Sequence, residues 1–310
     1  MKQIIGAILM LLVLLTAGVA QKSKPGSVRT NMLVTTDWLA KNLSNPKMVL
    51  IHIARGSKNY DAGHIPGARF LDYGELITTR NGVVNELPGV EKLKTIFANL
   101  GVNNDSRIVL MCEGQGIMSA RTYWTLDYLG FGDNAALLDG SLEKWKAEKR
   151  ELTTTVARNT VGNFSPRLNP KVLVSREAVR DVSWLNVNSE TIDTVLLDSR
   201  QPEGYSGEMK RADLPLNGHI PGAGNVYWMN TLESKESPVM KPIAELQKMY
   251  AEAGVAPGKK VVTYCWLGMM ASHGYFTLKY LGYDVAMYDG SFTEWAKSDG
   301  VTVVTGKNKK

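Results

Sequence analysis

The stretch that decides the fold is an apolar run that stops at a cysteine and then continues into a helical pattern: Lys260-Val261-Val262-Thr263-Tyr264-Cys265-Trp266-Leu267-Gly268-Met269-Met270-Ala271-Ser272. The β-branched residues before the cysteine predict a buried strand, and the apolar spacing after the glycine predicts a helix that ends at Gly282. The sequence therefore places one cysteine at the junction of a strand, a tight loop and a helix.

This junction has a chemical consequence for Cys265. Backbone N–H groups of such a loop surround the sulfur position, and the N-terminus of the following helix carries positive partial charge, so both favour an anionic sulfur. We therefore expect Cys265 to be a thiolate-prone nucleophile. The alternative is a buried strand-end cysteine that packs as a small hydrophobic residue.

Length and composition indicate a globular protein of two domains. The chain has 310 residues, of which 44% are hydrophobic and 21% charged, and its formal net charge is +6. No Lys/Arg stripe with interleaved aromatic residues is present, and the terminal Lys307-Asn308-Lys309-Lys310 is typical of a solvated tail. The composition excludes a nucleic-acid partner and favours small anionic substrates.

The N-terminal segment is predicted to be a signal peptide, residues 1–20. Lys2 precedes an almost wholly apolar run, and Gly18-Val19-Ala20 supplies the small residues of a cleavage site before Gln21. We therefore expect an exported protein, periplasmic or secreted, without a stable membrane span after cleavage. The alternative is a membrane anchor formed by residues 4–20.

An internal repeat is the most informative feature of the whole chain. Four short segments of the first half recur in the same order in the second half, 150 to 155 residues later. The pairs are Gly63-His64-Ile65-Pro66-Gly67-Ala68 with Gly218-His219-Ile220-Pro221-Gly222-Ala223, Tyr128-Leu129-Gly130 with Tyr280-Leu281-Gly282, Asp139-Gly140-Ser141 with Asp289-Gly290-Ser291, and Lys144-Trp145 with Glu294-Trp295.

The repeat predicts two tandem domains, 31–150 and 172–306, joined by a connector at 151–171. Strand patterns alternate with helix patterns in each copy; in the first copy they lie at 48–53, 90–100, 107–112 and 117–129. The fold class is therefore α/β, with a mostly parallel sheet flanked by helices in each domain and the active loop at the carboxyl end of a strand.

Superposition of the two copies without a gap predicts one working site. The overlay puts Gly268 on Gly116 and Cys265 on Glu113, so Cys112 lies one residue earlier, on the strand. A shift of one residue turns a strand side chain to the other face, so Cys112 is interpreted as structural. A disulfide between Cys112 and Cys265 stays open at this point, and it would occupy the proposed nucleophile.

Together these motifs resemble a known family. Two Gly-His-Ile-Pro-Gly-Ala segments, a Cys-x-x-Gly-x-x-Ala loop from Cys265 to Ala271, and Asp-Gly-Ser followed by a tryptophan are similar to a tandem-domain rhodanese of the thiosulfate and 3-mercaptopyruvate sulfurtransferase group. The resemblance covers roughly 34–304. It implies an active C-terminal domain and an N-terminal domain whose cysteine is replaced by an acidic residue, a pattern that Glu113 matches.

The resemblance also implies a reaction. Cys265 would attack the outer sulfur of a small anionic donor, the loop residues Trp266, Leu267, Gly268, Met269, Met270 and Ala271 would hold the persulfide, and a thiophilic acceptor such as cyanide or a thiol would take the sulfur. Arg200, in Asp198-Ser199-Arg200, resembles the arginine that helps to bind the donor; on the residues alone it could equally form a salt bridge. In the first copy Arg55 is expected to be displaced by one position from the place that corresponds to Arg200.

The loop departs from the family in a way that concerns the donor. Many members that use thiosulfate have basic residues directly after the cysteine, where this chain has Trp266 and Leu267. A loop without a local cation desolvates a dianion at greater cost. We therefore expect either weak use of thiosulfate or a different donor, an organic persulfide or 3-mercaptopyruvate.

The histidines are interpreted mainly as structural. His64 and His219 lie inside turns punctuated by Gly and Pro, where a hydrogen-bonded structural role is expected, whereas His273 is a candidate for raising the positive potential near Cys265. No Cys/His spacing resembles a metal site, and no pattern calls for a cofactor.

Two other functions use a cysteine in a comparable loop. A cysteine-based phosphatase needs an arginine six residues after the cysteine, where this chain has Ala271. An exported noncatalytic module, built for binding or redox sensing, would use Cys265 only as an oxidisable thiol. The sequence leaves open the physiological donor and acceptor, the oligomeric state and the role of Glu113.

Overall fold

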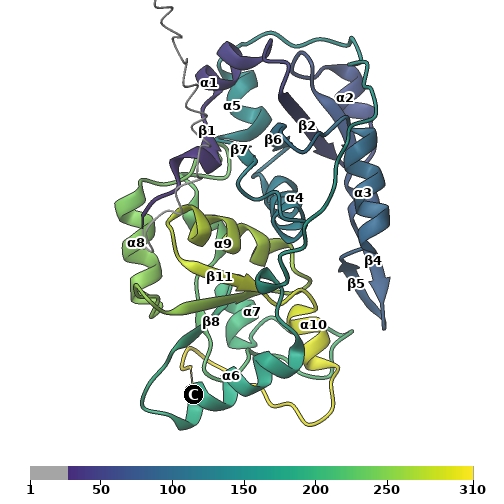
Figure 1. Cartoon of the computed structure of the whole chain (residues 1–310). Helices are drawn as coiled ribbons and strands as arrows, with labels where there is room; N and C mark the ends of the chain where they lie inside the picture. The colour runs from purple at the N-terminus through teal and green to yellow at the C-terminus, as the bar shows by residue number, and fades with distance from the viewer. Residues whose placement is uncertain (1–26, 310) are drawn as a thin grey trace, which may run out of the picture.

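Two parallel sheets, one from each half of the chain, form the framework of the computed structural model, which describes residues 27–309 (Figure 1). The expected signal peptide, residues 1–20, lies outside the described residues. Within residues 27–309 no helix is long and apolar enough to cross a membrane. The α/β fold class with tandem parallel sheets is confirmed.

The first sheet has five parallel strands in the order β1-β7-β6-β2-β3. The interior strand β2, between β6 and β3, is buried at every residue, as expected for a strand that has helices on both faces. The strands are β1 (Leu33–Val34), β2 (Met48–Ala54), β3 (Arg69–Asp72), β6 (Arg107–Cys112) and β7 (Ala135–Leu138). The helices are α1 (Thr36–Asn42), α2 (Lys58–Ala62), α3 (Val90–Asn99), α4 (Ile117–Tyr128) and α5 (Ser141–Ala147), with 3₁₀ turns at Thr30–Met32 and Tyr73–Leu76.

The second sheet has four parallel strands in the order β11-β10-β8-β9. The strands are β8 (Thr194–Asp198), β9 (Gly224–Asn225), β10 (Lys260–Tyr264) and β11 (Asp284–Met287). The helices are α6 (Arg176–Asn188), α7 (Pro202–Ser206), α8 (Ile243–Glu252), α9 (Met269–Tyr280) and α10 (Ser291–Ala296), with 3₁₀ turns at Pro170–Val172 and Trp228–Thr231.

The two domains share one apolar core through α4 and α9, which pack against each other. Tyr123 and Phe276 meet edge to face with their ring centroids 5.0 Å apart, and the Tyr275 hydroxyl donates to Asp127 at 2.5 Å. Because buried side chains from both sheets belong to this cluster, separation of the domains would expose it to water.

A small antiparallel hairpin of the first domain, β4 (Thr78–Arg80) and β5 (Val83–Glu86), leaves the main sheet and extends toward α10 of the second domain (Figure 1). The residue after β5, Leu87, donates its backbone N–H to Asp289 of the second domain at 3.1 Å. The hairpin thus brings one part of the first domain close to the Cys265 loop.

Each copy of the repeated hexapeptide is a buried hydrogen-bonded clasp. The His64 ring contacts the carbonyl oxygens of Tyr60 at 2.8 Å and Thr155 at 3.1 Å. In the second domain the His219 ring contacts the carbonyl oxygens of Tyr205 at 2.8 Å and Asn308 at 3.0 Å. Both rings are fully buried and stack on a tyrosine, which confirms the structural role predicted for them.

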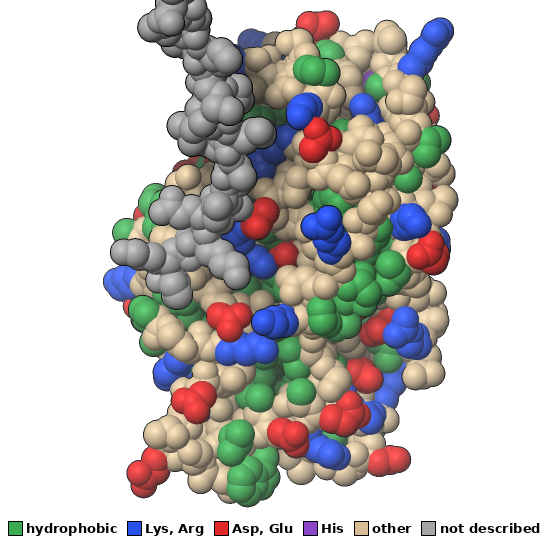
Figure 2. All heavy atoms as spheres, in the orientation of Figure 1, with side chains coloured by type: hydrophobic (Ala, Val, Ile, Leu, Met, Phe, Trp, Pro, Cys, Tyr) green, Lys and Arg blue, Asp and Glu red, His purple; other side chains and the backbone are tan. Residues whose placement is uncertain are grey.

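Charges of both signs are mixed over the face of the molecule in Figure 2, where Lys and Arg alternate with Asp and Glu. A dense basic stripe is not seen on this face, which agrees with the composition.

Candidate active site

Cys265 is the first residue after β10, and the strand, the loop and α9 follow one another as the sequence predicts. Its side chain is 1% exposed. Its backbone N–H donates to the Ser291 hydroxyl at 3.2 Å, and its carbonyl accepts from the Phe292 N–H at 2.9 Å. The repeated Asp-Gly-Ser segment therefore holds the cysteine in place, a role that its recurrence in the sequence did not disclose.

Two opposing effects act on the Cys265 thiol. Burial raises its pKa above the ordinary value, whereas the backbone N–H groups of Ala271, Leu267 and Met270 act to lower it. These three N–H groups act in the direction expected from the sequence, but the expected thiolate is not favoured at rest because desolvation outweighs them. The arrangement suits an anion that forms at the sulfur during a reaction.

Gly268 makes the tight turn from the loop into α9. Its φ of 79° lies in the left-handed region, and an added Cβ would lie 2.6 Å from Oδ1 of Asp289. The loop is thus closely packed against the Asp289 carboxylate, and only glycine fits at the turn.

The first domain repeats this architecture without the nucleophile. Cys112 is the last residue of β6, fully buried, and pairs with Ile53 as Tyr264 pairs with Asp198 in the second domain. Glu113 therefore occupies the place of Cys265, as predicted, and accepts a hydrogen bond from the Asn59 amide at 2.7 Å. Both cysteines are free, so the disulfide left open by the sequence does not form in this structure.

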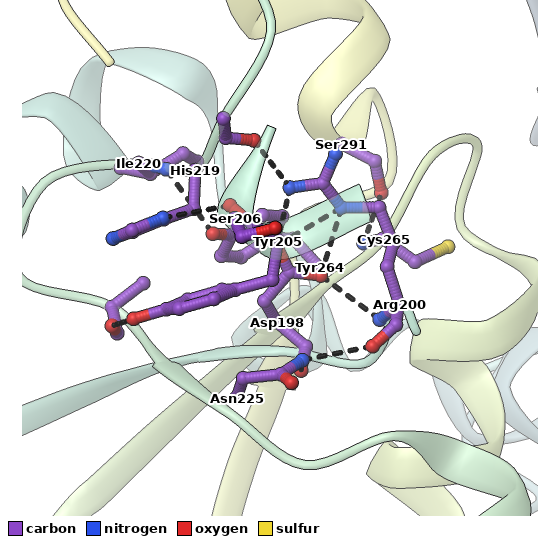
Figure 3. Close-up of polar contacts among 12 residues, drawn as sticks. Asp198, Arg200, Tyr205, Ser206, His219, Ile220, Asn225, Tyr264, Cys265 and Ser291 are labelled. Carbon is purple, nitrogen blue, oxygen red and sulfur yellow. Dashed lines mark hydrogen bonds and ion pairs between the residues drawn. The ribbon is translucent and has the colours of Figure 1, made fainter. Parts of the chain in front are cut away.

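Arg200 lies at the end of β8 in a sealed ion pair. Its guanidinium donates to both carboxylate oxygens of Asp198, at 2.5 to 2.9 Å, and to the Gly218 carbonyl at 2.7 Å. Arg200 and Asp198 are 0% exposed, and Figure 3 shows the Cys265 sulfur pointing away from the pair. The structure thus favours the salt-bridge interpretation of Arg200, and its role in donor binding stays a prediction that this geometry does not support.

Trp266 packs into the interior rather than lining an open site. Its ring lies between the guanidinium groups of Arg200 at 4.1 Å and Arg211 at 5.0 Å, and it meets Phe292 edge to face. Trp266 is 8% exposed, so it contributes to the site mainly by fixing the loop.

Two segments of the chain, one in each domain, match the same protein-family model. The family model described as "Rhodanese-like domain" matches residues 35–148 and again residues 181–298. The chain belongs to the rhodanese family of sulfurtransferases.

The relatives and solved structures support this membership. The chain is 32% identical over 291 residues to the sulfur carrier protein TtuD of Thermus thermophilus, covering 91% of this chain and 99% of TtuD. It is 31% identical to a Pseudomonas aeruginosa protein named "Probable 3-mercaptopyruvate sulfurtransferase", covering 88% of this chain and 98% of the relative. The crystal structure of SseA from Escherichia coli, a 3-mercaptopyruvate sulfotransferase, superposes with a TM-score of 0.73 at 27% identity over 84% of this chain and 98% of SseA.

The strand register of this rhodanese corrects one expectation about Arg55. Since Ile53 pairs with Cys112 and Asp198 pairs with Tyr264, Arg55 is the counterpart of Arg200 and is not displaced. Ile53 stands where the second domain has Asp198, so Arg55 lacks that carboxylate. Arg55 is exposed, and its guanidinium lies over the Tyr73 ring at 4.8 Å.

An open cavity of about 480 Å³ lies where the first domain meets the start of α9. The first domain contributes Arg55, Lys58, Asn59 and Glu113 to its lining, and the second contributes Met269 from the start of α9. A larger cavity, about 630 Å³, lies in the second domain beside Tyr205 and Lys309, and neither Cys265 nor any other loop residue lines it. Of these two cavities, the smaller one is adjacent to the Cys265 loop, through Met269.

His273 does not supply positive charge to the Cys265 loop, contrary to one possibility left by the sequence. It is 2% exposed, and burial lowers its pKa to about 4, so the ring is neutral at neutral pH. Among residues 27–309 no three His, Cys, Asp or Glu side chains are grouped so that they could hold a metal ion.

Proposed function

We propose that this rhodanese transfers a sulfur atom from a small anionic donor, the sulfane sulfur of thiosulfate or the thiol sulfur of a related compound such as 3-mercaptopyruvate, to a thiophilic acceptor through a persulfide on Cys265. The observation that carries the proposal is the position of this sulfur at a strand end, with the N–H groups of Leu267, Met270 and Ala271 acting on it. Donors held in a rigid, desolvated loop stabilise a developing anion without reorganisation.

The first half-reaction, written for thiosulfate, forms one sulfur–sulfur bond and breaks another. After the Cys265 thiol has lost its proton to solvent, the thiolate attacks the outer sulfur, and the electron pair of the S–SO₃ bond leaves with sulfite. The terminal sulfur of the persulfide carries the negative charge, and the loop N–H groups offset the cost of burying it.

The second half-reaction returns the enzyme to its starting state. A nucleophilic acceptor such as cyanide attacks the terminal sulfur, and the electron pair of the S–S bond returns to Cys265 as the thiolate. The two half-reactions share one site, so ping-pong kinetics are expected.

The cations that the loop lacks are supplied to the cavity by the first domain. Arg55 and Lys58 line it together with the single carboxylate Glu113, so the charged lining carries an excess of positive charge. Met269 lines the cavity and directly precedes the donors Met270 and Ala271 at the start of α9. Because Cys265 is 1% exposed, we infer that a donor held by Arg55 and Lys58 reaches the sulfur when the Met269 side chain moves.

The test is intact mass spectrometry of the protein after incubation with thiosulfate and, separately, with 3-mercaptopyruvate. We expect a gain of one sulfur atom that persists in Cys112→Ser and disappears in Cys265→Ser. The compound that produces this gain is then identified as a donor. Absence of an adduct from either donor, while Cys265 still reacts with an alkylating reagent, would overturn the proposal.

Export of the protein is also proposed, on the basis of the apolar run and the small residues before Gln21. N-terminal sequencing of protein from expressing cells is expected to begin at Gln21. A chain that retains Met1 in the membrane fraction would instead identify residues 4–20 as an anchor.

A further inference from the structure

We propose that Asn85, on the hairpin of the first domain, is a positioning residue for the reaction at Cys265 in the second domain. Its side-chain amide donates a hydrogen bond to the backbone carbonyl of Leu267 at 2.6 Å, across 182 residues of sequence. Leu267 lies two residues after Cys265, within the loop whose N–H groups act on the sulfur. This inference rests on the sulfur-transfer function proposed above.

The orientation of the Asn85 amide is set by the Leu267 carbonyl, which can only accept and so must face the amide nitrogen. The Tyr73 hydroxyl, which can donate or accept, then donates to Oδ1 of Asn85 at 2.6 Å. Tyr73 is 0% exposed and Asn85 6% exposed, so water does not compete with these bonds. The donor is thus built into the interior and is not a surface contact.

The backbone of Asn85 is held as firmly as its side chain. Its φ of 70° lies in the left-handed region, which asparagine tolerates better than most residues. Its carbonyl accepts a hydrogen bond from the Arg121 guanidinium at 2.7 Å. Arg121 in turn pairs with Asp289, which also accepts the Leu87 N–H. The hairpin therefore reaches the loop in a single defined position.

This contact matters because Leu267 joins two peptides of the loop. The N–H that acts on the Cys265 sulfur belongs to the Trp266–Leu267 peptide, while the carbonyl bound by Asn85 belongs to the Leu267–Gly268 peptide. A planar peptide whose carbonyl is fixed cannot rotate freely, so Asn85 restrains the Leu267–Gly268 peptide. Without this restraint the peptide could turn its oxygen toward the sulfur, where its negative partial charge would repel the thiolate and the persulfide.

The repeat supplies an internal comparison for this contact. The gapless overlay of the copies places Gln115 of the first domain on Leu267. There the loop residue donates with its side chain, whereas Leu267 accepts with its carbonyl: the Gln115 side chain donates to the Lys235 carbonyl at 3.3 Å, in an exposed position. The buried amide that holds a loop carbonyl is therefore found at the loop with the nucleophile.

The experiment compares Asn85→Asp, Asn85→Gly and the matched control Gln115→Ala with the wild type. Asn85→Asp keeps the shape but turns an acceptor toward the Leu267 carbonyl, and Asn85→Gly keeps the left-handed backbone without the side chain. The readouts are the pH profile of Cys265 alkylation, the lifetime of the persulfide, and kcat and KM for the donor. Thermal unfolding of each variant establishes that it is folded.

We expect the Asn85 variants to shift the alkylation profile to higher pH and to lower kcat by about ten- to a hundredfold, with a smaller change in KM. Asn85→Asp should have the larger effect, and Gln115→Ala should match the wild type. Folded Asn85 variants with the wild-type alkylation profile and persulfide lifetime would overturn the inference. Failure of the sulfur-transfer proposal is a distinct result, because the wild type itself would then form no persulfide.

Discussion

Arg121 of the first domain and Asp289 of the second form a buried ion pair directly beside Gly268, at the base of the Cys265 loop. Arg121 is 0% exposed and Asp289 5% exposed. The pair joins the first domain to the Asp-Gly-Ser segment that anchors the cysteine, so the integrity of the interface and the geometry of the site depend on the same two side chains.

Removal of one partner is expected to be costly. Arg121→Met leaves the Asp289 carboxylate buried without its cation, which should lower the free energy of unfolding by about 3–5 kcal/mol. The double variant Arg121→Met with Asp289→Leu should recover part of this loss, because it removes the uncompensated charge. Urea unfolding of both variants tests the prediction, and a double variant no more stable than the single one would contradict it.

Gly268→Ala is expected to disrupt the loop far more than the same change in the other copy. The added Cβ at Gly268 would lie 2.6 Å from Asp289 Oδ1 and 2.7 Å from Arg121 Nη1, whereas at Gly116, with the same φ of 79°, it would meet nothing within 4 Å. Gly116→Ala should therefore show only the left-handed backbone cost, about 1 kcal/mol. Gly268→Ala should show a larger loss of stability together with loss of persulfide formation. Equal losses of stability in the two variants would refute the packing argument.

Stability should depend on pH through Glu86, at the end of the hairpin. Burial raises the pKa of Glu86 from 4.5 to about 7; Asp289 and Glu294 act in the same direction, while Arg121 and Arg80 oppose them. A carboxyl group with a raised pKa binds its proton more tightly in the folded state, so stability falls as the pH rises through this range. Glu86→Gln should therefore reduce the decline in unfolding free energy between about pH 5 and about pH 8.

The control for this prediction is Glu75→Gln, since Glu75 is an exposed carboxylate of the same domain. It should leave the pH dependence of unfolding as it is in the wild type. If Glu86→Gln also leaves the pH dependence unchanged, Glu86 titrates in the ordinary acidic range.

The cavity charges should set the affinity for an anionic donor. Arg55→Gln and Lys58→Gln each remove a cation from the lining and should raise KM for thiosulfate by about two- to fivefold, since each exposed charge contributes up to about 1 kcal/mol. Glu113→Gln removes the opposing carboxylate and should lower KM. Steady-state kinetics at low and high salt measure both effects, and Lys92→Gln, an exposed change outside the cavity, is the control.

The sequence was sufficient for the features that are local or repeated. The alternation of strand and helix patterns predicted the sheets, and the overlay of the copies placed Glu113 opposite Cys265. Comparison of the two copies misplaced Arg55, because they differ in length between the strand end and the hexapeptide. Only the strand register aligns Arg55 with Arg200.

Properties that depend on burial or on distant contacts could not be predicted in this way. The helix N-terminus beside Cys265 is visible in the sequence, but the desolvation that raises the pKa of its thiol is a result of packing. Likewise no local pattern connects Asn85 with Leu267, because their contact depends on how the two domains pack.

The histidine clasps have a consequence for the history of the chain. In both domains the segment after the last helix returns to the hexapeptide, with Thr153 and Thr155 at His64 and with Val304 and Asn308 at His219. The start of the connector is thus the last structural segment of the first domain. The unit that was duplicated already included this terminal segment and its contact with the histidine. Shortening of the chain before residue 156 would therefore open the first domain, and the connector beyond it adds a second attachment, because Phe164 packs against Phe97 and Phe131.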